Sequence, residues 1–163
     1  MTVSQYNQCV DLHADAVYRF IVKNLRDNDA AHDIVQDAFE KVWLKAEEIQ
    51  FEKAKSYLFT TAYRFMLERI RKQSRIIPLD EQSAHRISDT YITPEVDLKR
   101  ILDEALARLP EIQRSVIMLR DYEGYSYEEI GSITGLNASQ VKVYIFRARV
   151  SLKNYLVSKE CVA

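Results

Sequence analysis

The side chains that most often carry catalysis or hold metals are few in this chain and far apart. The three histidines are His13, His32 and His85, and no nucleophile or metal-ligand partner lies at useful spacing from any of them. We therefore expect surface histidines, no catalytic residue, no metal and no cofactor. Cys9 and Cys161 lie near opposite ends of the chain. Two reduced thiols and one disulfide that joins the ends both fit this spacing. No residue pattern in the sequence supports an enzyme.

Charged residues separate into acidic and basic segments, although the formal net charge is only −1. Residues 27–52 are rich in acids, namely Asp27, Asp29, Asp33, Asp37, Glu40, Glu47, Glu48 and Glu52. Two later segments are basic and contain Arg64, Arg69, Arg71, Lys72 and Arg75, then Lys142, Arg147, Arg149 and Lys153. This separation indicates one acidic surface for a protein partner and two basic surfaces for polyanions. Ordinary solvated helix faces are the alternative.

Sparse glycine and proline favour helices throughout the chain. Only three of each occur among 163 residues, whereas all-β folds need many tight turns. Hydrophobic residues make up 47% of the chain, which is enough for packed cores. No run of about 18 apolar residues occurs, so we expect no membrane-spanning helix. The composition predicts an all-α protein with two small helical domains.

Apolar residues at helical spacing predict a three-helix domain over residues 1–75. The first helix is expected near residues 4–25. Asp29 can cap the second helix, and we expect Phe39 and Trp43 of that helix in the core. A polar connection over residues 47–55 leads into a third helix near residues 56–75. Three such helices can bury one shared core.

The helical spacing stops after the third helix and starts again near Pro94. We expect a flexible acidic linker over residues 76–93 and a second domain over residues 94–163. Thr93 can cap the first helix of that domain, whose buried stripe is expected to begin at Leu98. Pro110 can start the next helix, and Gly124 can end it in the left-handed conformation.

The most specific local signal lies between residues 125 and 153. Ser126 and Glu129 have capping-box spacing, and the short helix that they start can end at Gly135. Asn137 and Gln140 repeat the box before a second helix. This pattern predicts a helix-turn-helix whose second helix fits the major groove of DNA, although purely structural bundles share the geometry. The expected DNA contacts are Ser139, Gln140, Lys142, Tyr144, Arg147 and Arg149.

Motifs in both halves of the chain match one family in the expected order. Leu109-Pro110, the run from Gly124 to Ile130 and Arg147-Ala148-Arg149 resemble the fourth region of extracytoplasmic-function (ECF) sigma factors, which binds the −35 promoter element. The run from Ala31 to Trp43 resembles the second region of the same family. The resemblance extends from about residue 17 to residue 156, so it is far more specific than a helix-turn-helix alone.

The resemblance implies a subunit that binds core RNA polymerase and directs it to promoter DNA. In this family the second-region helix binds the β′ coiled coil, and the β flap is a further contact. Asp33, Gln36, Asp37 and Glu40 lie on one side of that helix, which makes them the expected polymerase-binding residues. The resemblance also implies a cytoplasmic protein that is controlled by an anti-sigma factor.

The resemblance further implies that residues 47–55 and the third helix melt the −10 promoter element. Melting without ATP needs a pocket for one extruded base, with aromatic and basic side chains along the single strand. The candidates are Tyr57, Tyr63, Arg64, Arg69, Arg71 and Lys72. The acidic linker resembles the family segment that runs toward the RNA exit path, and an unstructured tether explains it equally well.

Two other kinds of protein remain as alternatives. A stand-alone helix-turn-helix regulator usually has a dimer interface and a net basic DNA-binding face, whereas this chain is nearly neutral and has a separate acidic helix. A structural bundle or interaction module leaves both basic helices unexplained.

Overall fold

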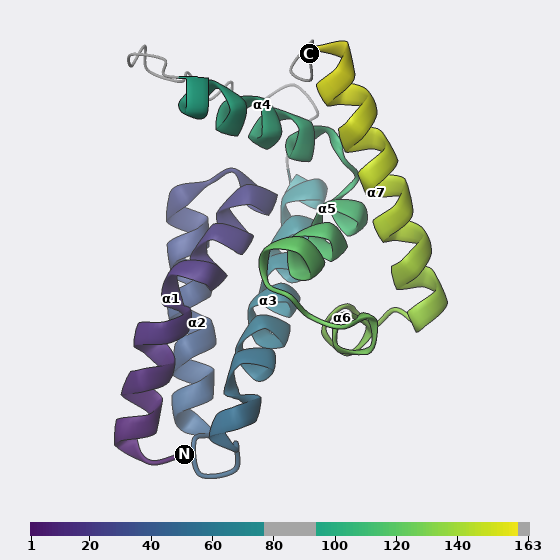
Figure 1. Ribbon diagram of the computed structural model, residues 1–163. Helices are drawn as coiled ribbons and strands as arrows, with labels where there is room; N and C mark the ends of the chain where they lie inside the picture. The colour runs from purple at the N-terminus through teal and green to yellow at the C-terminus, as the bar shows by residue number, and fades with distance from the viewer. Residues whose placement is uncertain (77–93, 160–163) are drawn as a thin grey trace.

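The computed structural model describes residues 1–76 and 94–159, and every regular element in these two ranges is helical. The all-α prediction is therefore confirmed. The N-terminal unit contains α1 (Val3–Leu25), α2 (Asn28–Leu44), the 3-10 turn η1 (Phe51–Lys53) and α3 (Ala54–Ile76). The C-terminal unit contains α4 (Pro94–Arg108), α5 (Glu111–Ile117), the π-helical turn η2 (Met118–Tyr122), α6 (Tyr127–Thr134) and α7 (Ala138–Ser158). Figure 1 shows both units.

The three helices of the N-terminal unit pack around a core of large apolar side chains. Phe20 of α1, Val42 of α2 and Leu58 of α3 are all less than 2% exposed. Phe39 is buried as predicted, but the prediction that Trp43 belongs to the core was wrong, because its side chain is 47% exposed. Trp43 lies in the last turn of α2, where the ring of Tyr6 contacts it edge-on at 4.9 Å between centroids.

Local hydrogen bonds explain where the first two helices begin. The Thr2 hydroxyl accepts a hydrogen bond from the Gln5 amide, and the Gln5 side chain accepts one from Thr2, so the pair forms a capping box. The cap of α2 is Asp27, whose carboxylate accepts the Ala30 amide at 3.1 Å. Asp29, the predicted cap, lies in the first turn instead, where a negative charge still favours the helix N-terminus.

The helix-turn-helix forms as its capping residues predict. Ser126 with Glu129 and Asn137 with Gln140 form the two expected capping boxes. Gly135 ends α6 in the left-handed conformation, at φ 82°. Leu98 differs from the prediction because it is 54% exposed, whereas Ala105 of the same predicted stripe is buried, as is its neighbour Leu106. The predicted cap Thr93 and the predicted linker lie outside the described residues, except for Ile76, which is the last residue of α3.

A close backbone approach inside the helix-turn-helix explains why α6 contains a glycine. A Cβ atom at Gly131 would lie 2.6 Å from the carbonyl oxygen of Leu136, which is closer than real Cβ contacts. The bare Cα of Gly131 therefore lets the turn after α6 fold back onto that helix.

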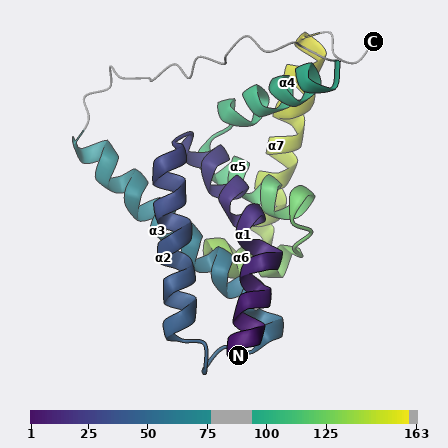
Figure 2. The ribbon, with the colours of Figure 1, turned by 90° about the vertical axis from the view of Figure 1, so that its left-hand side faces the viewer.

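The two units pack against each other and share a continuous core. Side chains of α1 and α3 contact α4, α5 and α6 across the interface between the units, which we call the interdomain interface. In Figure 1, α3 lies between α2 and the C-terminal unit, and Figure 2 shows α3 running behind α2 with its C-terminal end projecting from the molecule. Figure 1 shows α7 along the edge of the molecule opposite α1 and α2. The acidic helix α2 and the basic helix α7 consequently lie on opposite sides.

Candidate nucleic-acid-binding and polymerase-binding surfaces

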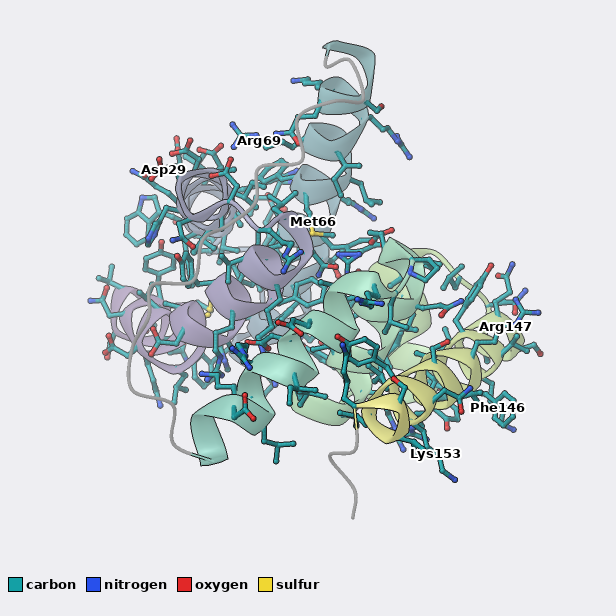
Figure 3. The ribbon with its side chains drawn as sticks, turned by 90° about the horizontal axis from the view of Figure 1, so that it is seen from above. Asp29, Met66, Arg69, Phe146, Arg147 and Lys153 are labelled. Carbon is teal, nitrogen blue, oxygen red and sulfur yellow. The ribbon has the colours of Figure 1, made fainter. Side chains whose placement is uncertain are left out.

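The outward face of α7 presents polar and basic side chains to solvent. Ser139, Gln140, Lys142 and Arg147 are all exposed, while Val141 and Ile145 of the same helix are buried. In Figure 3 the labelled Phe146, Arg147 and Lys153 point away from the rest of the molecule. Four of the six predicted −35 contacts therefore lie together on one accessible surface.

Three of the predicted α7 residues are partly engaged within the protein. The Gln140 side-chain oxygen accepts the Asn137 amide at 3.0 Å, which leaves its amide nitrogen as the group still available to a base. Arg149 donates to Asp121 at 2.8 Å, and this bond raises the pKa of Arg149. The ring of half-buried Tyr144 lies 6.0 Å from the Arg147 guanidinium. Among the predicted cations of α7, Lys142 and Arg147 are thus the best placed to meet a polyanion.

Sequence reasoning missed the apolar side chains on this same surface. Phe146 is 69% exposed, and Val143 and Val150 are also exposed. Their spacing of three and four residues places them in line along α7. A helical projection of α7 reveals this line once Val141, Ile145 and Ala148 are assigned to the buried side.

A hollow lies where α2 gives way to η1 and α3. Lys45, Glu48, Ile49, Gln50, Lys53 and Tyr57 line this hollow, whose volume is about 310 Å³. Tyr57, a predicted −10 contact, is half-buried and contributes an aromatic wall. The segment that was expected to capture a base thus contains a cavity with amide, ammonium and aromatic groups.

The other predicted −10 residues separate into an accessible group and a covered one. Arg64, Arg71 and Lys72 are exposed, and Figure 3 shows the C-terminal end of α3 projecting from the molecule. Tyr63 is only 2% exposed. Burial and the nearby Glu111 carboxylate of α5 raise the pKa of the Tyr63 phenol well above its usual value. In this arrangement Tyr63 belongs to the interdomain interface and is not accessible to DNA.

The predicted polymerase-binding residues form one solvent-facing stripe on α2. Asp33, Gln36, Asp37 and Glu40 are all exposed. Asp33 also lies 4.0 Å from the guanidinium of Arg69 on α3, so two predicted sites meet at this point. Figure 3 shows Arg69 near the end of α2 that carries Asp29. Because both partners are substantially exposed, this ion pair contributes little to stability.

Polar contacts join the two units beside these surfaces. Lys55 of α3 lies 3.7 Å from the Glu123 carboxylate and 4.9 Å from the centre of the Tyr125 ring. Arg114 of α5 is buried, and its guanidinium donates to the carbonyl oxygens of Asn24 at 3.2 Å and Leu109 at 2.9 Å. Burial lowers the pKa of Arg114. The Lys55–Glu123 pair therefore joins the C-terminal unit to α3, and the Arg114–Asn24 bond joins it to α1.

The residues that were considered for other chemistry do not come together. His32 is exposed and stacks on Tyr18 at 4.4 Å, whereas burial and nearby Lys55 lower the pKa of half-buried His13. Cys9 is fully buried, and Cys161 and His85 lie outside the described residues. Within the described ranges no group of potential ligands could hold a metal, and no helix is long and apolar enough to cross a membrane.

Comparison with known proteins identifies the family. The family model for sigma-70 region 2 matches residues 9–76, and the model for sigma-70 region 4 matches residues 99–152. RNA polymerase sigma factor SigV of Bacillus subtilis is 31% identical over 157 residues, which cover 93% of this chain and 90% of the relative. The chain belongs to the ECF family of RNA polymerase sigma factors. This sigma factor therefore acts in transcription initiation.

Two further similarities extend along nearly the whole sigma factor. The ECF RNA polymerase sigma-E factor of Haemophilus influenzae is 29% identical, and the match covers 91% of this chain and 86% of the relative. The solved structure of the sigma factor RpoE from Bartonella quintana, in complex with the anti-sigma factor NepR, has a TM-score of 0.77 at 27% identity. That match covers 94% of this chain and 98% of the other.

Proposed function

We propose that the sigma factor contacts polymerase and promoter through three separate surfaces. The α2 stripe of Asp33, Gln36, Asp37 and Glu40 binds the β′ coiled coil of core RNA polymerase. The exposed side of α3 and the adjoining hollow bind the melted −10 element, and the outward face of α7 binds the −35 element. The observation that carries this proposal is the placement of an exposed acidic helix and an exposed basic helix on opposite sides of one molecule.

Capture of the −10 element follows from the groups around the hollow. A single extruded base can stack on the ring of Tyr57 while Lys45 or Lys53 neutralises the neighbouring phosphate. Arg64, Arg71 and Lys72 are exposed further along α3 and can follow the single strand. Binding energy from these contacts offsets the cost of unpairing, so melting requires no ATP.

Use of the whole α3 surface requires the two units to separate. Tyr63 is buried against the C-terminal unit, and Lys55 is paired with Glu123. We infer that these side chains reach promoter DNA only after polymerase draws the units apart. An anti-sigma factor, like the one crystallised with RpoE, is the expected partner before that step. The expected location is the cytoplasm, where bacterial polymerase transcribes.

Charge reversal on α2 tests the polymerase contact. Asp33→Lys with Asp37→Lys should reduce capture of the sigma factor by core polymerase at least tenfold, because like charges replace opposite ones across the contact. The matched control is Asp11→Lys with Asp15→Lys, which makes the same charge change at exposed positions of α1. Circular dichroism should show both variants folded. Equal capture of the two double variants in a pulldown would contradict the proposed docking helix.

In vitro transcription with purified core polymerase tests the function as a whole. We expect the sigma factor alone to bind promoter DNA weakly, since its net charge is −1, and the holoenzyme to initiate at specific sites in a genomic library. Strong specific binding by the free protein, without any polymerase-dependent transcription, would instead support a stand-alone regulator.

A further inference from the structure

The centre of the outward face of α7 is apolar, although cations flank it. Val143 is 45% exposed, Phe146 is 69% exposed and Val150 is 42% exposed. These three side chains lie in line because three and four residues separate them. Phe146 projects beside Arg147 in Figure 3. Large apolar side chains exposed together in this way usually mark a binding surface.

Charge and size favour duplex DNA as the partner of this face. Lys142 and Arg147 are exposed, and their positions in the helical repeat place them on either side of the apolar line. Lys153 lies further along the same helix (Figure 3). A polyanion complements such a surface, whereas a second copy of α7 would bring like charges together. The helix is also narrow enough to enter a major groove about 12 Å wide.

Thymine supplies the apolar group that such a face can recognise. Its C5 methyl is the apolar group that the major groove presents, and aliphatic or phenyl side chains contact it directly. Polar recognition in the first turn of α7 is limited, because the Gln140 side-chain oxygen is occupied by the Asn137 amide. An apolar contact to a base can supply selectivity that the Gln140 oxygen cannot, because that oxygen already accepts the Asn137 amide.

We infer that Val143 and Phe146 are specificity-determining residues that contact thymine methyl groups of the −35 element. Lys142 and Arg147 hold the flanking phosphates and base edges, and they fix the depth at which the two apolar side chains meet the bases. This inference rests on the proposed binding of α7 to the −35 element. It adds a recognition of thymine that the charged residues of α7 do not provide.

Removal of single methyl groups from the DNA tests the inference. A promoter is first selected from a random library with the holoenzyme, and each thymine of its −35 element is then replaced by deoxyuridine, which lacks only the methyl. We expect about fourfold weaker holoenzyme binding at each contacted thymine. With Phe146→Ala or Val143→Ala, the same replacement should have no further effect at the thymine that the deleted side chain contacts.

Val157→Ala is the matched control for these variants. Val157 is 57% exposed on α7, but it lies near the C-terminal end of the helix, beyond the part that enters a groove. Holoenzyme with this substitution should remain as sensitive to deoxyuridine as the wild type. Because Phe146 and Val157 are both exposed, neither change should disturb folding, and circular dichroism checks this.

Different outcomes separate the inference from the proposed function. Equal binding of thymine and deoxyuridine promoters by the wild type, while Arg147→Ala still loses −35 protection, overturns the methyl contact alone. Unchanged −35 protection with Arg147→Ala overturns the proposed role of α7 itself. If Phe146→Ala weakens binding to core polymerase, and deoxyuridine has no effect on any variant, the apolar face serves a protein partner and the inference is wrong.

Discussion

The outward face of α7 and the side of α3 that is proposed to bind the −10 element carry similar basic and aromatic side chains but have different surroundings. On α7 the predicted contacts Lys142 and Arg147 are exposed in the described structure. On α3 the exposed cations Arg64 and Arg71 accompany Tyr63, which the C-terminal unit covers. The proposed −35 surface is thus accessible to solvent, whereas part of the proposed −10 surface also serves as an interface within the protein.

This difference shows that residue spacing along one helix predicts which side chains share a face, but not which of them another part of the chain covers. Residue spacing determines which side chains share a face, and that is enough for α7, whose outward face nothing in the described residues covers. On α3, by contrast, the accessible part depends on the C-terminal unit that packs against this helix. The following predictions disturb one of the two surfaces at a time.

Loss of Arg114 should have the largest effect, on the interdomain interface. Its buried guanidinium donates to the carbonyl oxygens of Asn24 and Leu109, which stay buried without a donor in Arg114→Ala. We expect the free energy of unfolding to fall by about 2–4 kcal/mol in urea titrations. Gln113→Ala, on the neighbouring half-buried residue, is the control and should change it far less. Equal stability of both variants would show that the Arg114–Asn24 bond does not hold the units together.

Gly131→Ala should damage the α7 surface and spare the N-terminal unit. Alanine normally stabilises a helix relative to glycine by roughly 1 kcal/mol. At this position the added Cβ would meet the Leu136 carbonyl oxygen at 2.6 Å, so the sign reverses and we expect a loss of about 1–3 kcal/mol. Protection of the −35 element should fall, while polymerase capture is retained. Ser132→Ala, at the next and exposed position, is the control. A stabilised Gly131→Ala variant would contradict the close approach.

A charge swap at the interdomain interface should have a smaller effect. Lys55→Glu places a carboxylate next to that of Glu123, and the pair is only partly shielded from solvent, so we expect a change of ~1 kcal/mol in favour of separated units. Hydrogen exchange of the amides in the first half of α3 should become faster. Adding Glu123→Lys should restore slower exchange, since opposite charges meet again. No recovery in the double variant would argue against the ion pair.

Alkaline pH should open the interdomain interface, with no effect near neutrality. Burial raises the pKa of both Tyr63 and Tyr125 from 10.0, and nearby carboxylates add to this rise. The stability that these neutral phenols contribute is complete below pH 10 and is lost as the pH rises through their higher folded-state values. Tyrosinate absorbance should show a late-titrating class whose ionisation coincides with an increase in radius by X-ray scattering. Ionisation of every tyrosine before any expansion would contradict this coupling.

The features predicted correctly from the sequence depend on neighbouring residues. Both capping boxes of the helix-turn-helix are local, because Ser126 and Asn137 act on amides three residues away, and Gly135 takes its conformation alone. The acidic stripe of α2 was predictable for the same reason, because one helix positions all of its members.

The features missed from the sequence depend on residues far away in the chain. Tyr63 is buried at the interdomain interface beside Glu111 of α5, and Arg149 is engaged because Asp121 lies beside α7. Trp43 and Leu98 belong to helical stripes but are both exposed, although the ring of Tyr6 on α1 contacts one edge of Trp43. Periodicity alone does not reveal where packing ends.

Footprinting of the holoenzyme on one selected promoter tests the division between the two surfaces most directly. Protection of the −35 element is measured together with permanganate reactivity of unpaired thymines at the −10 element. Arg147→Ala should lose −35 protection, while some −10 opening remains. Arg64→Ala with Arg71→Ala should keep −35 protection but lose −10 opening. If both variants lose the same signals, or if neither loses any, α7 and α3 do not bind separate promoter elements.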